Sequence, residues 1–144
     1  MTAPLFARVL GVLALLAGGL GFLPAVAPPP PIDAPVVTLS QHYGLLATMF
    51  PVNVATSGLA IFFGLWGLLA SLNFAAAVNY CRWLMWVNLG GVAFGMLPIT
   101  NTFFGIAPLY GHDIWLHLVI TFVALFAGYG RASLPSHPPF SAEA

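Results

Sequence analysis

Residues 52–71 read VNVATSGLAIFFGLWGLLAS and contain no charged side chain. The run is as long as the roughly 20 apolar residues that cross the hydrocarbon core of a bilayer. A segment inside hydrocarbon must satisfy its own backbone hydrogen bonds, which a helix does and an open sheet does not. We therefore predict that residues 52–71 form a transmembrane helix.

Three further apolar runs, residues 9–27, 83–98 and 114–130, have a similar length. With residues 52–71 they predict an all-α, polytopic membrane protein with four transmembrane helices in an antiparallel bundle. Arg8, the apolar run after it and the sequence Ala25-Val26-Ala27 also resemble a secretory signal peptide. Because Pro28 directly follows that potential cleavage site, we expect the first run to remain as a helix.

The composition supports a membrane protein and excludes some partners. Of 144 residues, 60% are hydrophobic and 4% are charged, whereas soluble domains carry about a quarter charged residues. The formal net charge is zero with three cationic side chains, so no basic face is available for nucleic acid. The single cysteine, Cys81, excludes a disulfide within the chain.

The connecting segments carry turn and interface signals. The Pro-rich residues 28–35 predict an extended connector. Residues 38–50 mix polar and apolar positions before Pro51, which predicts a short helix in the membrane interface. We place the four-helix domain at residues 1–131 and a Pro-rich tail, disordered on its own, at residues 132–144.

The three arginines predict the orientation. Arg8 precedes the first predicted helix, Arg82 lies in the predicted loop 72–82, and Arg131 follows the fourth helix. In a four-helix serpentine all three lie on one side of the membrane. The positive-inside rule therefore predicts cytoplasmic termini, in a bacterial inner or photosynthetic membrane.

Small residues recur at alternating steps of three and four along the predicted helices, which is typical of helices packed in a left-handed bundle. Apolar burial does not drive association in lipid, so close backbone approach is needed. We expect Phe62, Phe63, Phe122 and Phe126 to face lipid or a partner. The glycines expected at helix contacts are Gly11, Gly18, Gly21, Gly64, Gly67, Gly91, Gly95 and Gly128.

One ionisable side chain, His117, lies within an apolar run, four residues after Asp113. That spacing stacks the two side chains on a helix, so Asp113 can accept an imidazole N–H. Asn53 and Thr56 begin the second predicted helix at the same level, and Asn101 lies in the facing loop. We predict that these residues form a polar cap at the outer end of the bundle.

Several roles for this cap remain open. The polar groups could simply bond to one another and close the bundle. His117 could instead be the axial ligand of a chlorophyll-type pigment or a haem. His42, His112 and His117 could form a metal site, or the cap could begin a proton or solute pathway. Asn88, on the third predicted helix, is expected to bond across the bundle.

The order of several short segments resembles a known family. That family comprises small bacterial four-helix membrane proteins, found in actinobacteria and cyanobacteria, whose domain is of unknown function. The likeness covers residues 9–130. It rests on Leu10-Gly11, Gly21-Phe22-Leu23-Pro24, Phe50-Pro51-Val52-Asn53, Phe63-Gly64-Leu65-Trp66-Gly67-Leu68 and Asp113-Ile114-Trp115-Leu116-His117.

The chain also departs from the family pattern. Members often carry histidines near the start of the second helix, where this chain has Thr56 and Ala60. A cofactor or proton site built from those histidines would be incomplete here, which favours a structural role. The resemblance implies no activity.

We therefore expect a non-catalytic accessory subunit of a larger membrane complex, such as a photosynthetic or respiratory one. Its partners would be other integral membrane proteins and lipids, and it would require no cofactor. The alternative is a stand-alone membrane protein that binds or conducts a small apolar ligand or a proton at the cap around His117.

Overall fold

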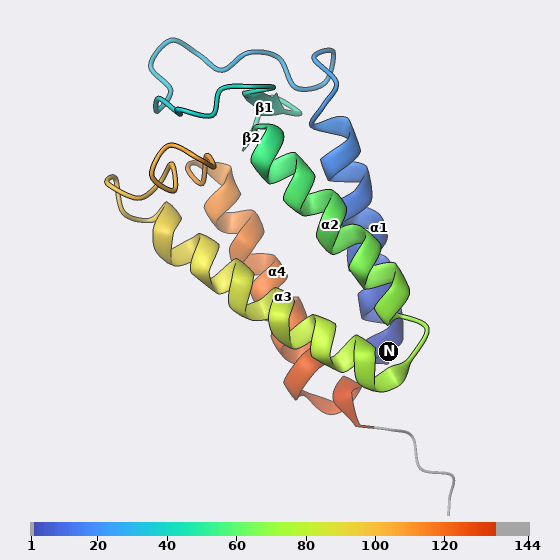
Figure 1. Cartoon of the computed structure of the whole chain (residues 1–144). Coiled ribbons are helices and arrows are strands. Elements are labelled where there is room, and N and C mark those ends of the chain that lie inside the picture. The colour runs from blue at the N-terminus through green and yellow to red at the C-terminus, as the bar shows by residue number, and fades with distance from the viewer. Residues whose placement is uncertain (1, 135–144) are drawn as a thin grey trace, which may run out of the picture.

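The chain forms four helices that run alternately up and down. The computed structural model describes residues 2–134. Figure 1 shows that the first helix begins, and the fourth ends, at the same end of the molecule, hereafter the terminal end. The helices are α1 (Ala3–Leu20), α2 (Val54–Ala70), α3 (Phe74–Gly95) and α4 (His112–Tyr129), followed by a short 3-10 helix, η1 (Arg131–Ser133).

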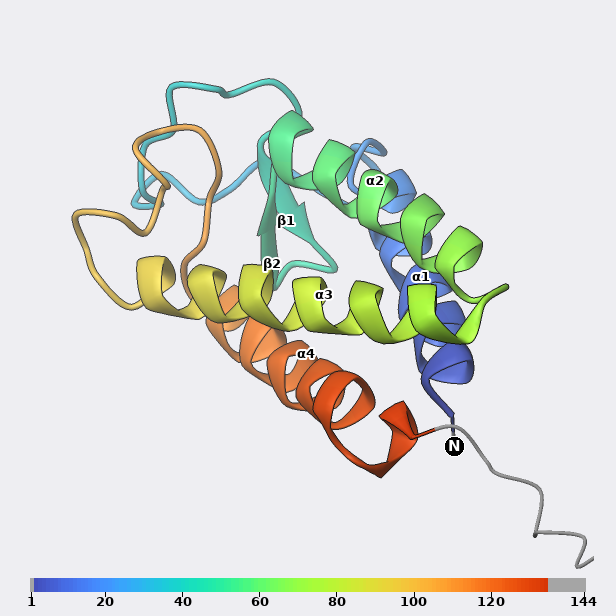
Figure 2. The same ribbon diagram turned by 60° about the horizontal axis from the view of Figure 1, so that its bottom comes forward.

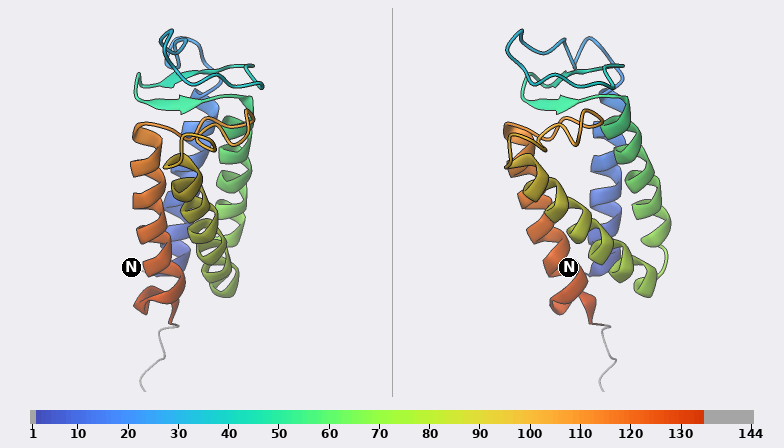
Figure 3. Two further views of the ribbon diagram at one scale, coloured as in Figure 1. Left: turned by 90° about the vertical axis from the view of Figure 1, so that its left-hand side faces the viewer. Right: turned by 60° about the vertical axis from the view of Figure 1, so that its left-hand side comes forward.

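The opposite end, hereafter the loop end, is covered by the two long connections and a small hairpin (Figure 3). The hairpin pairs β1 (Gly44–Leu46) with β2 (Phe50–Val52) in antiparallel register. The predicted interfacial helix over residues 38–50 is therefore wrong. Backbone amides of this segment bond instead to carbonyl groups of the chain that follows α1. Leu45 N donates to Pro28 O, and Ala47 N donates to Val26 O.

The boundaries of two helices also differ from expectation. The first helix, expected at residues 9–27, begins at Ala3, with Pro4 in its first turn, and ends at Leu20 before Pro24. Proline suits a first turn and cannot continue a helix. The third helix, expected at residues 83–98, begins nine residues earlier, at Phe74. There the side chain of Asn73 accepts from Ala76 N at 3.1 Å.

The earlier start of α3 removes the predicted loop 72–82 and places Arg82 inside a helix. Arg8 likewise lies within α1. The second and fourth helices begin and end within two residues of the predicted positions 52–71 and 114–130. Of the predicted tail, residues 135–144 lie outside the described residues.

The helices associate as two close pairs, α1 with α2 and α3 with α4, and α3 contacts all three of the others. Figure 2 shows α3 running between α4 and the other pair. The main cluster of buried apolar residues lies toward the terminal end. It comprises Ala3, Ala7, Ala70, Ala77, Val78, Tyr80, Cys81, Leu84, Met85, Ala124 and Ala127.

Large apolar side chains remain exposed on the outer sides of the helices. Phe62, Phe122 and Phe126 are exposed as expected. Phe63 is not, because it packs against the buried cluster and stacks on Trp66. By length and composition, α1 and α4 could each cross a membrane, and α2 is apolar but one residue shorter.

The eight glycines expected at helix contacts all lie against another part of the chain. At each position an added Cβ would come within 3.0 Å of a heavy atom. Gly11 and Gly64 face each other across α1 and α2, so these backbones pack without intervening side chains. By contrast, a Cβ added at Gly19, Gly58 or Gly90 would meet nothing within 4 Å.

Candidate functional site

A three-residue polar network joins α3 to α4. His117 Nδ1 lies 2.7 Å from Asn88 Oδ1, and His117 Nε2 lies 3.1 Å from Asp113 Oδ2. Asn88 Nδ2 donates to Leu84 O at 2.8 Å. Asn88 and Asp113 are buried, whereas the His117 side chain is 23% exposed. We call His117, Asn88 and Asp113 the His117 network.

Donor and acceptor rules fix the hydrogen bond between Asn88 and His117. The Leu84 carbonyl only accepts, so the Asn88 amide must turn its nitrogen toward Leu84 and its oxygen toward His117. His117 Nδ1 must then carry a proton and donate it. The other ring nitrogen, Nε2, faces Asp113 Oδ2, and this contact is an ion pair when both ring nitrogens are protonated.

The local sequence explains why these groups meet. His117 and Asp113 are one turn apart on α4, so they stack on the same side of the helix. Asp113 lies in the first turn of α4, where the helix dipole favours a negative charge. Gly91 leaves room for the imidazole, because an added Cβ there would lie 3.0 Å from His117 Cγ.

The other residues of the predicted polar cap lie apart from this network. Among them, Asn53 bonds to Leu39 and Ile106, and we call these three residues the loop clamp. Asn53 Nδ2 donates to Leu39 O at 2.8 Å and to Ile106 O at 2.7 Å, and so joins the two long connections. Asn53 Oδ1 accepts from the backbone of Ala55 and Thr56. Asn53 is fully buried, and every polar atom of its side chain is bonded.

Thr56 and Asn101 have supporting roles at the loop end. The hydroxyl of Thr56 accepts from Asn53 N at 2.8 Å and completes the capping box of α2. Asn101 acts through its backbone, since its carbonyl accepts from Leu109 N at 2.7 Å. The expected cap is thus divided between the loop clamp, which caps α2, and the His117 network between α3 and α4.

A pair of tyrosines, Tyr43 and Tyr110, also joins the two connections. Tyr43 donates its single hydroxyl hydrogen to Pro35 O at 2.8 Å, so the Tyr110 hydroxyl must donate to Tyr43 across 2.7 Å. Burial, followed by this hydrogen bond, raises the pKa of Tyr110 well above its ordinary value. The two tyrosines are 67 residues apart in the sequence, so no local pattern indicates that they meet.

The three histidines considered for a metal site do not meet. Within residues 2–134, no group of three His, Cys, Asp or Glu side chains could hold a metal ion. His42 packs edge-to-face on Phe22, with ring centroids 5.2 Å apart, and His112 is exposed at the start of α4. His117 belongs to the network described above.

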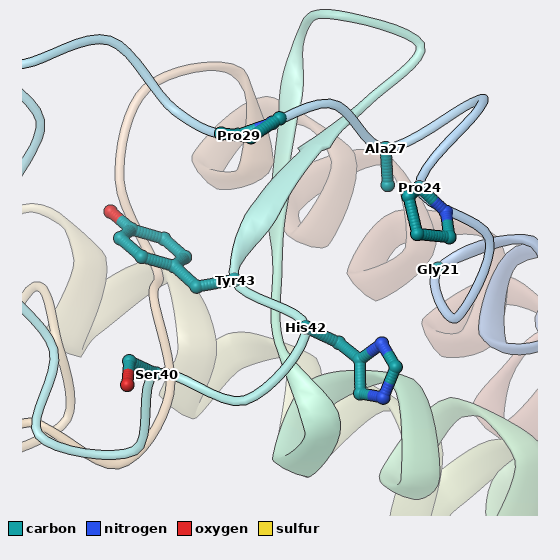
Figure 4. Close-up of a pocket in the computed structure, with 7 residues that line it drawn as sticks. All are labelled: Gly21, Pro24, Ala27, Pro29, Ser40, His42 and Tyr43. Atoms are coloured by element: carbon teal, nitrogen blue, oxygen red, sulfur yellow. The ribbon is translucent and has the colours of Figure 1, made fainter.

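His42 also lines a pocket of about 210 Å³ beside the turn that follows α1. Figure 4 shows the side chains of His42 and Tyr43 pointing in opposite directions from adjacent positions. The hydroxyl of Tyr43 is already bonded to Pro35 and Tyr110. The polar groups of this pocket therefore do not converge on one point, as they would in a specific binding site.

The His117 network pairs an imidazole with a carboxylate, but it presents no free ligand atom. Both imidazole nitrogens are already bonded to protein atoms. A pigment or haem metal at His117 would have to displace Asn88 or Asp113. In this arrangement the imidazole joins α3 to α4 and lies against a buried carboxylate.

Substituting Asn88 tests the network. We expect Asn88→Leu to lower the free energy of unfolding by about 1–2 kcal/mol, because His117 Nδ1–H loses its acceptor. Asn79→Leu, at an exposed position on the same helix, should have little effect. Denaturant titration in detergent micelles measures both. Equal effects of the two substitutions would contradict the assigned hydrogen bond.

Comparison with known families places the chain within one of them. A family model described as a domain of unknown function (DUF4383) matches residues 5–130, which include α2, α3, α4 and all but the first two residues of α1. No curated protein and no solved structure matches the chain.

Proposed function

The chain belongs to this family of unknown function, and from that premise we propose that it is an integral membrane protein with four spanning helices. In this proposal it is a non-catalytic subunit that packs beside larger membrane proteins. The observation that carries the proposal is the exposure of large apolar side chains on all four helices. Examples are Leu13 and Leu16 on α1, Phe62 and Leu65 on α2, Trp83 and Val87 on α3, and Val119 and Phe122 on α4.

Burial of the helices also supports a membrane setting. In the apolar segments that form α1 and α4, only 22% and 28% of the length, respectively, is buried inside the molecule. Core helices of soluble proteins hide most of their apolar surface from water. Exposed apolar surface over the length of such helices favours lipid or membrane-protein neighbours.

The arginines support an orientation with cytoplasmic termini. Arg8 near the start of α1, Arg82 in the first half of α3 and Arg131 after α4 all belong to the terminal end. Asp33 and Asp113 lie toward the loop end. The positive-inside rule places the terminal end in the cytoplasm.

Thiol labelling tests this orientation. Cys81 is fully buried, so single cysteines are best introduced at Ile32, in the first connection, and at Leu72, in the α2–α3 turn. Both side chains are exposed. We expect an impermeant maleimide added to intact cells to modify Ile32→Cys and not Leu72→Cys. The opposite pattern would overturn the orientation, and wild-type protein measures any background from Cys81.

Native purification tests the role as a subunit. After extraction of host membranes in mild detergent, a tagged copy should migrate with a complex much larger than the 15.2 kDa chain. Phe62→Ala and Phe122→Ala remove exposed rings of α2 and α4. At least one should weaken that co-migration without changing the folded yield. A discrete small oligomer for the wild-type protein would contradict the proposal.

A second candidate function rests on the contact between His117 and Asp113, which pairs an imidazole with a carboxylate. In this alternative the protein acts alone and binds or conducts a small apolar ligand or a proton at the loop end. An absorbance spectrum of the natively purified sample tests for a pigment or haem. Loss of that absorbance in His117→Ala would identify His117 as the ligand of the pigment or haem, and unchanged cofactor content would remove His117 as its ligand.

A further inference from the structure

An open groove lies between α3 and the last turn of α4. Its lining residues are Asn79, Arg82, Trp83, Trp86 and Tyr129, and its volume is about 300 Å³. We call it the Arg82 groove. It belongs neither to the His117 network nor to the loop clamp, and it faces the terminal half of the molecule.

Arg82 is held in place at one edge of this groove. Its Nε donates to Gly128 O at 2.9 Å, and its Cζ lies 4.9 Å from the centre of the Tyr129 ring. Gly128 permits this approach, because an added Cβ there would lie 3.0 Å from Arg82 Cγ. The guanidinium plane is therefore oriented by two contacts, while Arg82 as a whole remains exposed.

The charge of Arg82 has no carboxylate partner within residues 2–134, where the one acid–base contact within 4.0 Å joins Asp113 to His117. Both acidic residues of that segment, Asp33 and Asp113, lie toward the opposite end of the helices. Among the same residues, the terminal guanidinium nitrogens also donate to no protein acceptor. An oriented guanidinium of this kind can bind a phosphate through two parallel hydrogen bonds.

The remaining groups in the groove suit the same ligand. Trp86 Nε1 donates to the Tyr129 hydroxyl at 3.3 Å, which leaves the hydroxyl hydrogen available to donate in turn. Asn79 adds a side-chain amide. Trp83 and Trp86 are 60% and 58% exposed, and tryptophan favours the boundary between headgroups and acyl chains. The groove thus combines N–H and O–H donors with apolar rings.

We propose that the Arg82 groove binds the phosphate of an anionic phospholipid headgroup in the cytoplasmic leaflet. This inference rests on the membrane orientation proposed above. Arg82 forms the ion pair with the phosphate, Tyr129 and Asn79 donate further hydrogen bonds, and the two tryptophan rings contact the glycerol and upper acyl region. Basic pockets between helices on the cytoplasmic side commonly hold such headgroups.

Native mass spectrometry of delipidated protein in detergent tests the proposal. We expect a phosphatidylglycerol to bind more tightly than a phosphatidylcholine of the same acyl chains, because the choline cation cancels the charge of the phosphate that both lipids carry. Arg82→Gln should weaken phosphatidylglycerol binding about tenfold, the effect of losing one charge-assisted contact. Arg82→Lys should give an intermediate loss, because lysine keeps the charge without the planar pair of donors.

Two matched controls remove the same charge elsewhere at the terminal end. Arg8→Gln and Arg131→Gln should leave phosphatidylglycerol binding within about twofold of wild type, because neither residue lines the groove. Equal losses in all three variants, or no loss in Arg82→Gln, would overturn the proposal. Unchanged thermal midpoints in detergent confirm that each variant is folded.

A competition arm distinguishes the two sources of phosphate. Inorganic phosphate at the lipid's own concentration should not displace phosphatidylglycerol, and displacement would overturn the lipid as ligand. Failure of the membrane proposal is seen separately. If Leu72→Cys is labelled from outside, the orientation is wrong, but phosphatidylglycerol binding in detergent should still depend on Arg82. If binding does not depend on Arg82 while the labelling agrees with the orientation, only the groove proposal is refuted.

Discussion

Replacing Gly64 with alanine is expected to lower the free energy of unfolding by about 2–3 kcal/mol, at the upper end of overpacking effects. A Cβ at Gly64 would lie 2.7 Å from Leu15 N and 2.9 Å from Gly11 O. Both contacts are backbone atoms of α1, so no side-chain rotation can relieve them. The α1 and α2 helices must move apart, which loses packing along the whole pair.

Gly58→Ala is the matched control for this prediction. Gly58 lies on the same helix, and an added Cβ there would meet nothing within 4 Å. Alanine should therefore leave stability unchanged or raise it by up to about 1 kcal/mol, because glycine loses more backbone entropy in a helix. Unfolding titrations in the same detergent measure both variants. A similar loss in both would mean that close approach is not the cause.

Replacing Asn53 with alanine should lower the free energy of unfolding by about 2–4 kcal/mol, the sum of a lost helix cap and unpaired buried carbonyls. The substitution removes the acceptor for Ala55 N and Thr56 N. It also removes both donors that join Leu39 O to Ile106 O. Because Asn53 is fully buried, water cannot readily replace these bonds.

Two further variants separate the functions of Asn53. Asn53→Asp keeps the cap acceptor but places a carboxylate against two carbonyl oxygens, so the connections should detach while α2 remains capped. Hydrogen exchange at Thr38 and Leu39, whose amides donate to Gly105 O, reports this detachment. Asn73→Ala, at the exposed cap of α3, should cost about 1 kcal/mol. Equal destabilisation by Asn53→Ala and Asn73→Ala would refute the loop clamp.

Local patterns in the sequence account for most of the helical part of the fold. The apolar runs predict the ends of α2 and α4 to within two residues. A long apolar helix can be recognised from its own sequence, without knowledge of a distant partner. The glycine spacing of Gly11, Gly64 and Gly91 predicted positions where the structure brings elements together. The start of α3 is not predicted, because an arginine beside an apolar run indicates a loop, whereas the partner of Arg82 on α4 allows it within a helix.

The parts that could not be predicted depend on distant segments. The hairpin of β1 and β2 is completed by backbone groups of Val26 and Pro28, which no local periodicity reveals. Asn53 could be recognised as polar, but its bond to Ile106 spans 53 residues. The Arg82 groove likewise appears only when Tyr129, from the end of the last helix, reaches α3.

The contact between His117 and Asp113 also bears on biogenesis. Both side chains belong to α4, so the carboxylate has its imidazole partner before that helix meets any other. In a chain that crosses the bilayer as proposed, the translocon then receives Asp113 beside a histidine of the same helix and not as an isolated carboxylate. The hydrogen bond to Asn88 can form only when α3 packs against α4.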